Sequence, residues 1–598
     1  MPRVSQVIIF FVLLLTLGLG GSPCAAQTPA PNCSIPGAQP VIELQCCLTA
    51  AFGAALAGDP NAWNDVYIPC AEGLPPAQMP APPNPNPPPP SACIQPQIAT
   101  ATARAISPMD QGNCGITFVD PVPALQNGNK LKSDQTEPDT LATKGTVVSA
   151  IAADGAARVV IRIPADSVGE VLQVTLLNEK GSAGQPDLGT LSSVNGTENT
   201  GSLQVVAREA NGHPMAFAVY YPPPDFSRGG ADDQAASRPV VVQAQSLASI
   251  VYQPLNASLN ILRPPVVLVH GLWGDSSDWD HFTPVINDRR FYVRRAEYSL
   301  RVTIEDSDPE YPGFIVEKNP PTTSAFGFEF NANLVLTWIK VFIEDFRSQK
   351  NAAAAQADVV AHSMGGDVTR TLLNLDGYAG TDSFGTGVVH KLITIGTPHL
   401  GSPLAVQLLQ DSNSLMRTML AESGLYSFRF VNWGPRWEHG GVGDLQGDGQ
   451  GGLLSDALGK IKNGKSVQTA VIAGNLTATY LAFLDSPTSN AAYIRSACYG
   501  NPLAANLTST GWPKVMGGTG ESDGIVPIKS QLPVPAAYTA PGVLHSPGTR
   551  NLGFSIGIPG FRHGPPSELD PDPTGGIPAQ VIRLLNERVR SDDFHPLP

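Results

Sequence analysis

The sequence predicts an α/β fold with a doubly wound, mostly parallel sheet and a partly helical cap, preceded by a β-sandwich module and a cysteine- and proline-rich N-terminal region. After about residue 256, short apolar runs alternate with amphipathic helical stretches. Between about 140 and 250, β-type runs follow one another with no helical period between them. Six of the eight cysteines and a proline tract lie between residues 27 and 115. These three observations divide the chain into its expected parts.

Residues 1–26 have the layout of a secretory signal peptide, with Arg3 before a 13-residue apolar run and small residues up to Ala26. That run is shorter than the roughly 20 residues that a membrane-spanning helix needs. A lipid anchor on Cys24 is the alternative, and Pro23 disfavours it. We therefore expect cleavage after Ala26 and a soluble protein that is secreted or otherwise extracytoplasmic.

Residues 27–115 are predicted to be a disulfide-stapled region or stalk. An even number of cysteines in an exported chain is typical of a disulfide framework, whose connectivity the spacing does not define. Ten of the sixteen positions from 75 to 90 are proline, which favours an extended polyproline spacer. Cys498 is left over as a free thiol. The six clustered cysteines are Cys33, Cys46, Cys47, Cys70, Cys93 and Cys114.

The charge balance disfavours a nucleic acid or an anionic membrane surface as the main partner. The 598 residues include 37 basic and 51 acidic side chains, a formal net charge of −14. Binding to phosphate-rich surfaces draws on an excess of positive charge. The length suffices for about three or four folded units and leaves the oligomeric state undefined.

Residues 116–255 are predicted to form a β-sandwich of two antiparallel sheets. Glycine, asparagine and proline turns separate their β-type runs. The pattern resembles bacterial immunoglobulin-like modules, and nothing in it is typical of catalysis. Contact with a cell surface or matrix is the role that we consider for this module. The runs are ARVVIRI, EVLQVTLL, SLQVVARE, MAFAVYY and PVVVQAQ.

Residues 256–598 are predicted to form the doubly wound α/β domain. Four largely apolar runs, VVLV, DVVA, KLITIGT and VQTAVIAGN, are typical of parallel strands buried on both faces. NLVLTWIKVFIEDF and IPAQVIRLLNERV have the period of amphipathic helices. Some 65 residues between GTPHLGS and VQTAVIAGN exceed an ordinary connection. We expect them to form a cap at about 402–466 over the carboxyl edge of the sheet.

A serine stands between a predicted strand and a predicted helix in DVVAHSMGGDVTR, residues 358–370. This arrangement is typical of a nucleophile elbow, a sharp turn that lifts the side chain of Ser363 clear of its neighbours. Ala361 and Gly365, two positions to either side, are small enough to permit the turn. The alternative is a serine that only caps the helix.

A second motif, PPVVLVHGLWGDSSDW (264–279), lies about ninety residues upstream of the serine. With both motifs the chain resembles the α/β hydrolase superfamily, in particular secreted lipases and esterases with an AxSxG elbow. It is more loosely similar to hydrolases that deacylate glycosylphosphatidylinositol lipids. The resemblance covers roughly 260–598 and implies that 256–598 is the catalytic domain. At matching positions it implies an oxyanion hole formed by the backbone amides of Leu272 and Met364.

A serine nucleophile needs a base, and the base needs an acid that holds its tautomer. The resemblance implies the chain order serine, acid, histidine. Asp523 in GESDGIVPIKSQ matches the acid turn of these lipases, and Glu521 is its competitor. Beyond Asp523 lie His545, His563 and His595, the last of which is three residues from the carboxyl terminus. We predict His545, which follows a short apolar run, as the base, with His563 as the alternative.

These residues predict a secreted serine hydrolase that cleaves carboxylic esters through Ser363, His545 and Asp523 and an acyl-enzyme intermediate. Lipid-like acyl esters are the expected substrates, and the chemistry requires no metal or organic cofactor. One alternative is a phospholipase or an acyltransferase with the same triad. Another is an exported binding or adhesion protein whose hydrolase fold has lost activity. Acyl-chain length and alcohol preference are left open.

Overall fold

The computed structural model describes part of the chain, and all described residues belong to one compact unit, Pro90–Pro598. No helix among them is long and apolar enough to cross a membrane. The described residues are 115–123, 145–194, 196, 199–210, 212–248, 254–272, 274–299, 327–410, 440–449, 451–476, 481–485, 492, 495–496, 499–500, 502–518, 521–543, 545, 568–569 and 576–598.

Several predictions from the sequence lie outside the described residues. They concern the signal peptide, residues 27–114 with the polyproline spacer, all eight cysteines and His563. The expected disulfide bonds and the expected export therefore stay predictions.

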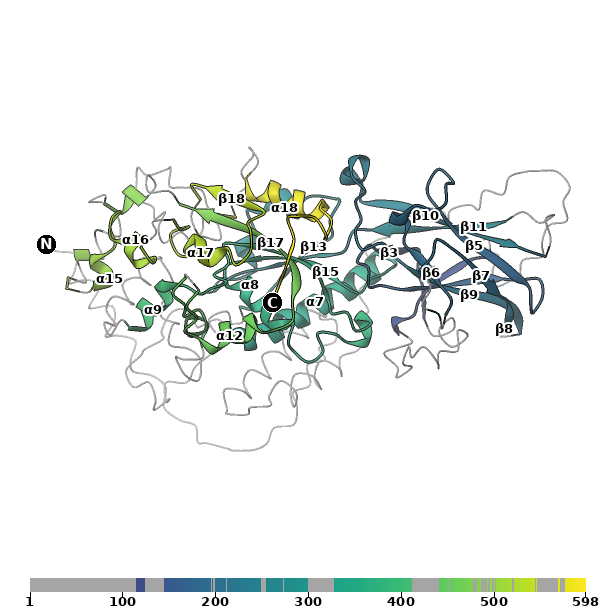
Figure 1. The fold of residues 1–598 in the computed structure, drawn as a ribbon, viewed down its shortest axis with the longest axis horizontal. Helices are drawn as coiled ribbons and strands as arrows, with labels where there is room; N and C mark the ends of the chain where they lie inside the picture. Colours follow the sequence, from purple (N-terminus) through teal and green to yellow (C-terminus); the bar gives the residue numbers. More distant parts are fainter. Residues whose placement is uncertain are drawn as a thin grey trace, which may run out of the picture. The chain divides into compact units, whose positions relative to one another are not determined.

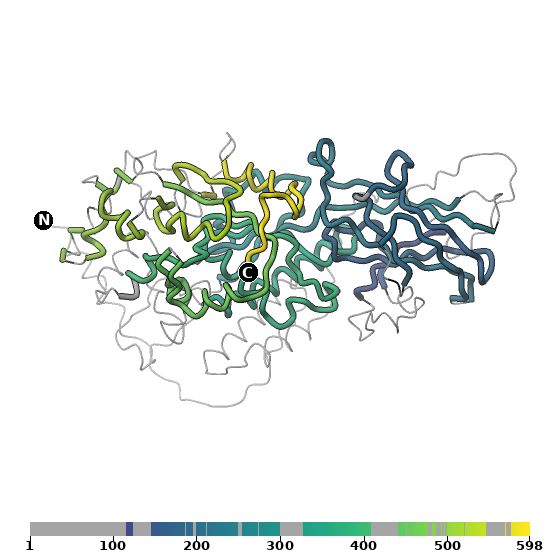
Figure 2. Tube along the Cα trace, in the orientation of Figure 1, coloured from purple at the N-terminus to yellow at the C-terminus, as the bar shows by residue number. Residues whose placement is uncertain are grey.

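A seven-stranded sheet forms the centre of the α/β domain. Six strands are parallel in the order β13-β12-β15-β16-β17-β18, and β19 pairs antiparallel with the start of β17. The yellow C-terminal segment in Figure 2 makes this return to the sheet. The predicted mostly parallel sheet is confirmed, with the four predicted apolar runs as β12, β15, β16 and β17. The strands are β12 (Val266–Val269), β13 (Val293–Ala296), β15 (Ala357–His362), β16 (Val389–Ile395), β17 (Val467–Asn475), β18 (Tyr538–Pro541) and β19 (His595–Leu597).

Helices cover both faces of this sheet (Figure 1). Val266 and Leu268 share a hydrophobic cluster with residues of α6 and α18. Val267 and Val269 are equally buried and point to the opposite face, because side chains alternate along a strand. Both α7 and α8 contact β12 on that side. The helices are α6 (Thr283–Ile286), α7 (Phe328–Lys350), α8 (Met364–Leu372), α17 (Ile528–Gln531) and α18 (Ile577–Asn586).

The strand order reverses between β12 and β15. From β12 the chain moves outward to β13, then returns to β15 on the other side of β12 and continues through β16 and β17 to β18. Ligands of open α/β sheets bind at the carboxyl ends of the strands at such a point. Val269 and Ala361 are paired at these ends, so the turn after β12 and the serine after β15 meet at one edge.

Two six-stranded sheets form the β-rich module. One has the order β2-β1-β4-β9-β6 with β8 beside β9, and the other has the order β14-β3-β11-β10-β5-β7. Ile161 and Tyr220 of the first sheet share a hydrophobic cluster with Val174 and Val242 of the second. Most strand pairs are antiparallel as predicted, but β3 is parallel to β11 and to β14. The immunoglobulin-like identity of the module stays a prediction.

The strands of this module are short. Apart from β14, seven of them have six residues or fewer. They are β1 (Thr117–Asp120), β2 (Thr146–Val147), β3 (Ala150–Ala152), β4 (Val159–Pro164), β5 (Val171–Leu177), β6 (Thr190–Ser192), β7 (Ser202–Val206), β8 (Arg208–Ala210), β9 (His213–Tyr221), β10 (Ser237–Ser246) and β11 (Leu255–Leu262).

The strand β11 corrects the predicted boundary between residues 255 and 256. It lies almost wholly in the range predicted for the α/β domain, yet it pairs with β10 along its whole length and with β3. Its exposed and buried residues alternate, as in a strand with one solvent-facing side. The β-rich module therefore extends to Leu262.

A short strand of the α/β domain completes a sheet of the β-rich module. β14 (Ala352–Ala353) lies between α7 and β15 in the chain, but it pairs with β3. The buried carboxylate of Asp154 accepts two backbone N–H groups from its own turn and two from Ala355 and Gln356, just before β15. The module thereby holds the start of the strand that leads to the predicted nucleophile.

A buried ion pair joins the same two parts of the chain. Arg347 of α7 lies 2.9 Å from Asp120 of β1, and both side chains are almost fully buried. Breaking such a pair from one side leaves an uncompensated charge, which is strongly destabilising. The β-rich module and the α/β domain are therefore attached by more than a linker.

The predicted cap region contains helices in the part that the structure describes. They are α9 (Pro403–Gln410), α11 (Gly441–Asp444) and α12 (Asp456–Lys462). A second excursion, which the sequence did not single out, follows β17 and includes α15 (Pro502–Ala505) and α16 (Trp512–Val515). α16 contacts α9, so the two excursions meet beyond the carboxyl edge of the sheet.

We expect Asp154→Ala to lower the free energy of unfolding by about 2–4 kcal/mol, because it leaves four buried amides without their acceptor. Denaturant unfolding followed by circular dichroism measures this change. Asp187→Ala is the matched control, since its exposed pair with Arg588 (3.7 Å) joins the same two parts and should contribute about 0–1 kcal/mol. Equal effects of the two substitutions would contradict the role given to Asp154.

Candidate active site

The backbone of Ser363 adopts a conformation that few residues other than glycine adopt. Its dihedral angles are φ 54° and ψ −135°, between the end of β15 and the first residue of α8. Such a conformation costs on the order of 1–3 kcal/mol and persists only where the surroundings enforce it. Its N–H donates to the carbonyl of Ile395 (2.9 Å), and its carbonyl accepts from the Thr397 hydroxyl (2.9 Å). The strained turn of a nucleophile elbow is therefore present at Ser363.

Glycines allow the surrounding segments to approach this turn. A Cβ atom at Gly365 would lie 2.4 Å from the carbonyl oxygen of His270, and one at Gly366 would lie 2.3 Å from the Thr397 hydroxyl. Real Cβ atoms do not come this close to other atoms. Gly365 thus lets the start of α8 pack against the turn after β12, and Gly366 lets it pack against the loop after β16.

Ser363, His545 and Asp523 lie in hydrogen-bonding contact. His545 Nε2 is 2.9 Å from Ser363 Oγ, and His545 Nδ1 is 2.9 Å from Asp523 Oδ2. Ser363 is half-buried, His545 is 8% exposed and Asp523 is fully buried. The structure therefore brings together the three side chains selected from the sequence, with the imidazole between the hydroxyl group and the carboxylate.

Four N–H donors surround the carboxylate of Asp523. Oδ1 accepts from the backbone amides of Ile525 (2.9 Å) and Val526 (2.7 Å), and Oδ2 accepts from Gln531 (3.0 Å) and His545. These four donors fix the position of the carboxylate and direct Oδ2 toward His545. The competitor Glu521 is exposed and its carbonyl accepts from the Ile528 amide, away from this arrangement.

The two amides predicted for the oxyanion hole border Ser363. Met364 is the first residue of α8, and N–H groups in a first helical turn have no partner within the helix. Leu272 follows Gly271, and a Cβ atom at Gly271 would lie 2.7 Å from Ser363 Cβ. Both amides therefore belong to segments in contact with the serine, one of them at a helix amino terminus that favours negative charge.

His270 braces the turn that contains Leu272. Its ring stacks on Tyr298 with centroids 3.9 Å apart, and Nδ1 lies 3.1 Å from the carbonyl oxygen of Gly271. Burial alone would lower the pKa of His270, but Glu297 at 3.7 Å raises it above its usual value. His270 is fully buried and is directed into this contact network.

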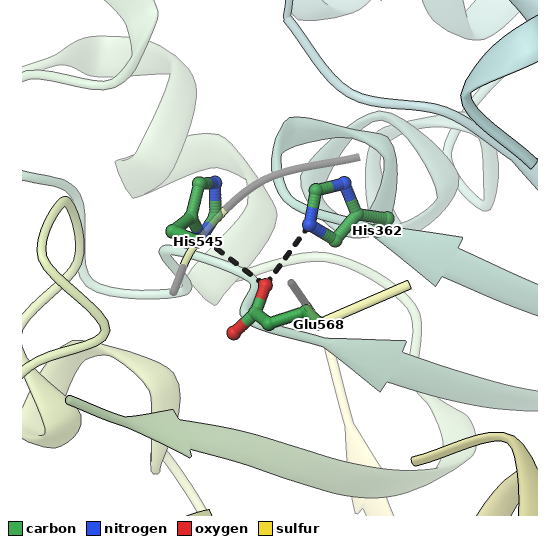
Figure 3. Close-up of side chains that lie close together, drawn as sticks. All are labelled: His362, His545 and Glu568. Atoms are coloured by element: carbon green, nitrogen blue, oxygen red, sulfur yellow. Dashed lines mark hydrogen bonds and ion pairs between the residues drawn. The ribbon is translucent and has the colours of Figure 1, made fainter. Parts of the chain in front are cut away.

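Glu568 and His362 lie beside the triad and were not selected from the sequence (Figure 3). Glu568 Oε2 is 2.9 Å from His362 Nε2 and 3.4 Å from His545 Nδ1. Burial, followed by the charge of His545, holds the pKa of His362 well below its usual value. Burial, followed by the charge of Asp523, holds the pKa of Glu568 well above its usual value. The segment PPSELD carries no motif that would have pointed to Glu568.

Among the described residues, His362, His545 and Glu568 also form a cluster of possible metal-ligand type, with ligand atoms within 4.8 Å of one another. Imidazole and carboxylate groups are common zinc ligands. Here the atoms are in direct hydrogen-bonding contact, and His545 Nδ1 also contacts Asp523. Hydrogen bonding therefore accounts for their arrangement.

Residues 265–424 match the model of a family described as "Putative serine esterase (DUF676)". The match includes the turn after β12, the elbow at Ser363 and β16. Over these residues the chain is similar to a family of putative serine esterases, in agreement with the resemblance to α/β hydrolases found in the sequence. A search of curated proteins found no match.

Two solved structures are similar to the chain. Phospholipase PlaB from Legionella pneumophila is 15% identical, with 54% of this chain and 60% of that chain covered and a TM-score of 0.29. The chain thus spans about 60% of the length of PlaB. An extracellular α/β-hydrolase from a Paenibacillus species is 14% identical, with 55% and 100% covered and a TM-score of 0.21. TM-scores this low do not establish a common arrangement over the aligned length.

We expect Gly271→Ala to lower kcat/KM for ester cleavage by about 10- to 100-fold, because the added methyl group would displace the serine or the turn beside it. Steady-state kinetics on the purified variant measure the change. Gly459→Ala in α12 is the control, since no atom lies within 4 Å of the added Cβ. Wild-type kinetics for Gly271→Ala would show that the turn and the serine are not in functional contact.

Proposed function

We propose that the chain is an exported serine hydrolase that cleaves carboxylic esters through an acyl-enzyme intermediate. Ser363 is the nucleophile, His545 the general base and Asp523 the acid that orients the base. The observation that carries the proposal is the pair of 2.9 Å contacts at the two nitrogens of one imidazole, with the serine on one side and the carboxylate on the other. The family match supports the serine esterase class.

In the first half of the reaction, His545 Nε2 accepts the hydroxyl proton as Ser363 Oγ attacks the ester carbonyl. Asp523 accepts the Nδ1–H, which keeps Nε2 free as the acceptor and stabilises the imidazolium that forms. His545 then donates the proton to the leaving alkoxide, and the acyl group stays on Ser363. A water molecule repeats the sequence and releases the acid.

The carbonyl oxygen becomes negative in both tetrahedral intermediates. The amides of Leu272 and Met364 are the donors that we assign to it. Each fixed donor of this kind typically lowers the activation free energy by about 2.7–4 kcal/mol. Because both belong to packed segments, the donors do not have to reorganise during the reaction.

Lipid-like acyl esters are the substrate class that we propose. Two excursions after β16 and β17 approach each other beyond the carboxyl edge of the sheet, where ligands of open α/β sheets bind. The looser sequence resemblance to lipid deacylases supports the same class. Product analysis in the presence of an added alcohol distinguishes hydrolysis from acyl transfer.

We expect Ser363→Ala to abolish ester cleavage, with a loss that can reach about a millionfold because the triad acts as one unit. His545→Ala should lose nearly as much, and His563→Ala should keep most of the activity. Cleavage of p-nitrophenyl butyrate by folded variants, checked by circular dichroism, measures these losses. The reverse ranking of the two histidines would reassign the base.

We expect kcat/KM to rise with acyl-chain length across p-nitrophenyl esters from acetate to palmitate, because each buried CH₂ group contributes about 0.8 kcal/mol to binding. The panel should be measured below and above the concentration at which each substrate aggregates. A preference for acetate at all concentrations would exclude lipid-like esters as the substrate class while leaving the esterase chemistry intact.

A further inference from the structure

Glu568 occupies a space that the central sheet leaves open for it. Its side chain is fully buried, and Figure 3 shows it next to both His362 and His545. A Cβ atom at Gly396, directly after β16, would lie 2.4 Å from Oε2, and one at Gly474 in β17 would lie 2.2 Å from Oε1. Glycine inside a strand commonly marks such a close approach. The carboxyl group is therefore built into the sheet edge.

Oε2 of this carboxyl group faces two imidazoles. His362, which directly precedes the nucleophile, contacts it at 2.9 Å through Nε2. His545 Nδ1 lies 3.4 Å from it and 2.9 Å from Asp523 Oδ2. One N–H of the catalytic histidine thus has two carboxyl groups near it, and Asp523 is the nearer.

The two carboxyl groups differ in their surroundings. Asp523 has four N–H donors, whereas Oε1 of Glu568 has no hydrogen-bond partner among the described residues. Two neighbouring buried carboxyl groups do not both ionise readily. Burial and the charge of Asp523 accordingly raise the pKa of Glu568 well above its usual value, which favours its protonated form.

We propose that Glu568 has two roles toward His545. It is a positioning residue that steadies the imidazole beside Asp523, and it is a reserve carboxylate that accepts the Nδ1–H when Asp523 is removed. This inference rests on the proposed function, because only a histidine that acts as a base requires a defined tautomer.

The charges around Glu568 explain how the exchange would occur. Among the described residues, the titratable groups that face it are Asp523, His545 and His362. Removing Asp523 removes the charge that opposes ionisation of Glu568, so the pKa of Glu568 falls. A shift of a few tenths of an ångström then shortens the 3.4 Å contact to a hydrogen bond of about 2.9 Å. His545 keeps its proton on Nδ1, and Nε2 still accepts from Ser363.

The test measures kcat and KM for a soluble ester across pH in four variants. They are Asp523→Ala, Glu568→Gln, the double variant that carries both of these substitutions, and His545→Ala as the reference. Alanine is the suitable substitution, because an asparagine amide at 523 would point its NH₂ group at donors and impose the wrong tautomer on His545. Glutamine at 568 keeps the shape of the side chain but cannot ionise.

Loss of a triad acid alone typically costs about 10⁴-fold in kcat. We expect Asp523→Ala to lose only about 10- to 100-fold, with activity that rises with pH as Glu568 ionises, and Glu568→Gln to lose less than about tenfold. The double variant should show the loss of about 10⁴-fold that is typical of a missing triad acid, a larger loss than the two single losses combined. KM should change little, since neither group contacts substrate.

A double variant as active as Asp523→Ala, or Asp523→Ala already at the level of His545→Ala, would overturn the inference. If Glu568→Gln does not fold, the pH profile of Asp523→Ala decides: a rising limb absent from the wild type supports a reserve carboxylate, and its absence refutes one. Full activity of Ser363→Ala would instead show that the proposed function itself is wrong.

Discussion

The backbone of Ser363 is the constraint on which the rest of the site depends. A φ of 54° with ψ −135° aims the side chain out of the junction between β15 and α8, at a cost that neighbouring segments must offset. They do so by hydrogen bonds from β16 and its loop, and by packing that only glycine allows at positions 271, 365 and 366. These neighbours together hold the turn that presents the hydroxyl group.

The order of strands in the sheet brings the other groups to this serine. β12 ends in the turn that carries Leu272, β15 ends at Ser363, and Gly396 and Gly474 near the ends of β16 and β17 make room for Glu568. The acid and the histidine follow β17 and β18 in the chain. The two carboxyl groups have different surroundings: Asp523 is surrounded by donors, whereas burial and the charge of Asp523 raise the pKa of Glu568 well above its usual value. Residues about 200 positions apart thereby form one network.

Much of this arrangement could be predicted, because runs buried on both faces are continuously apolar and an elbow needs small residues around its serine. Asp523 and His545 were selected by motif and chain order, and the structure places them in contact. Glu568 could not be found in this way, since its role depends on two carboxyl groups meeting in three dimensions. The pairing of β14 with β3 was equally invisible, because two alanines carry no strand signal. β11 was assigned to the α/β domain because the alternation of strands and helices was expected to begin at about residue 256, whereas this strand pairs with β10.

The contact between His545 and Ser363 is what would convert an ordinary hydroxyl into a nucleophile, and covalent labelling tests it most directly. Folded wild-type protein and His545→Ala would be treated with an active-site fluorophosphonate, and the modified peptide mapped by mass spectrometry. The account predicts one adduct per chain, on Ser363, in the wild type and a far slower reaction in the variant. No adduct on the folded wild type, or an adduct on another serine, would contradict it.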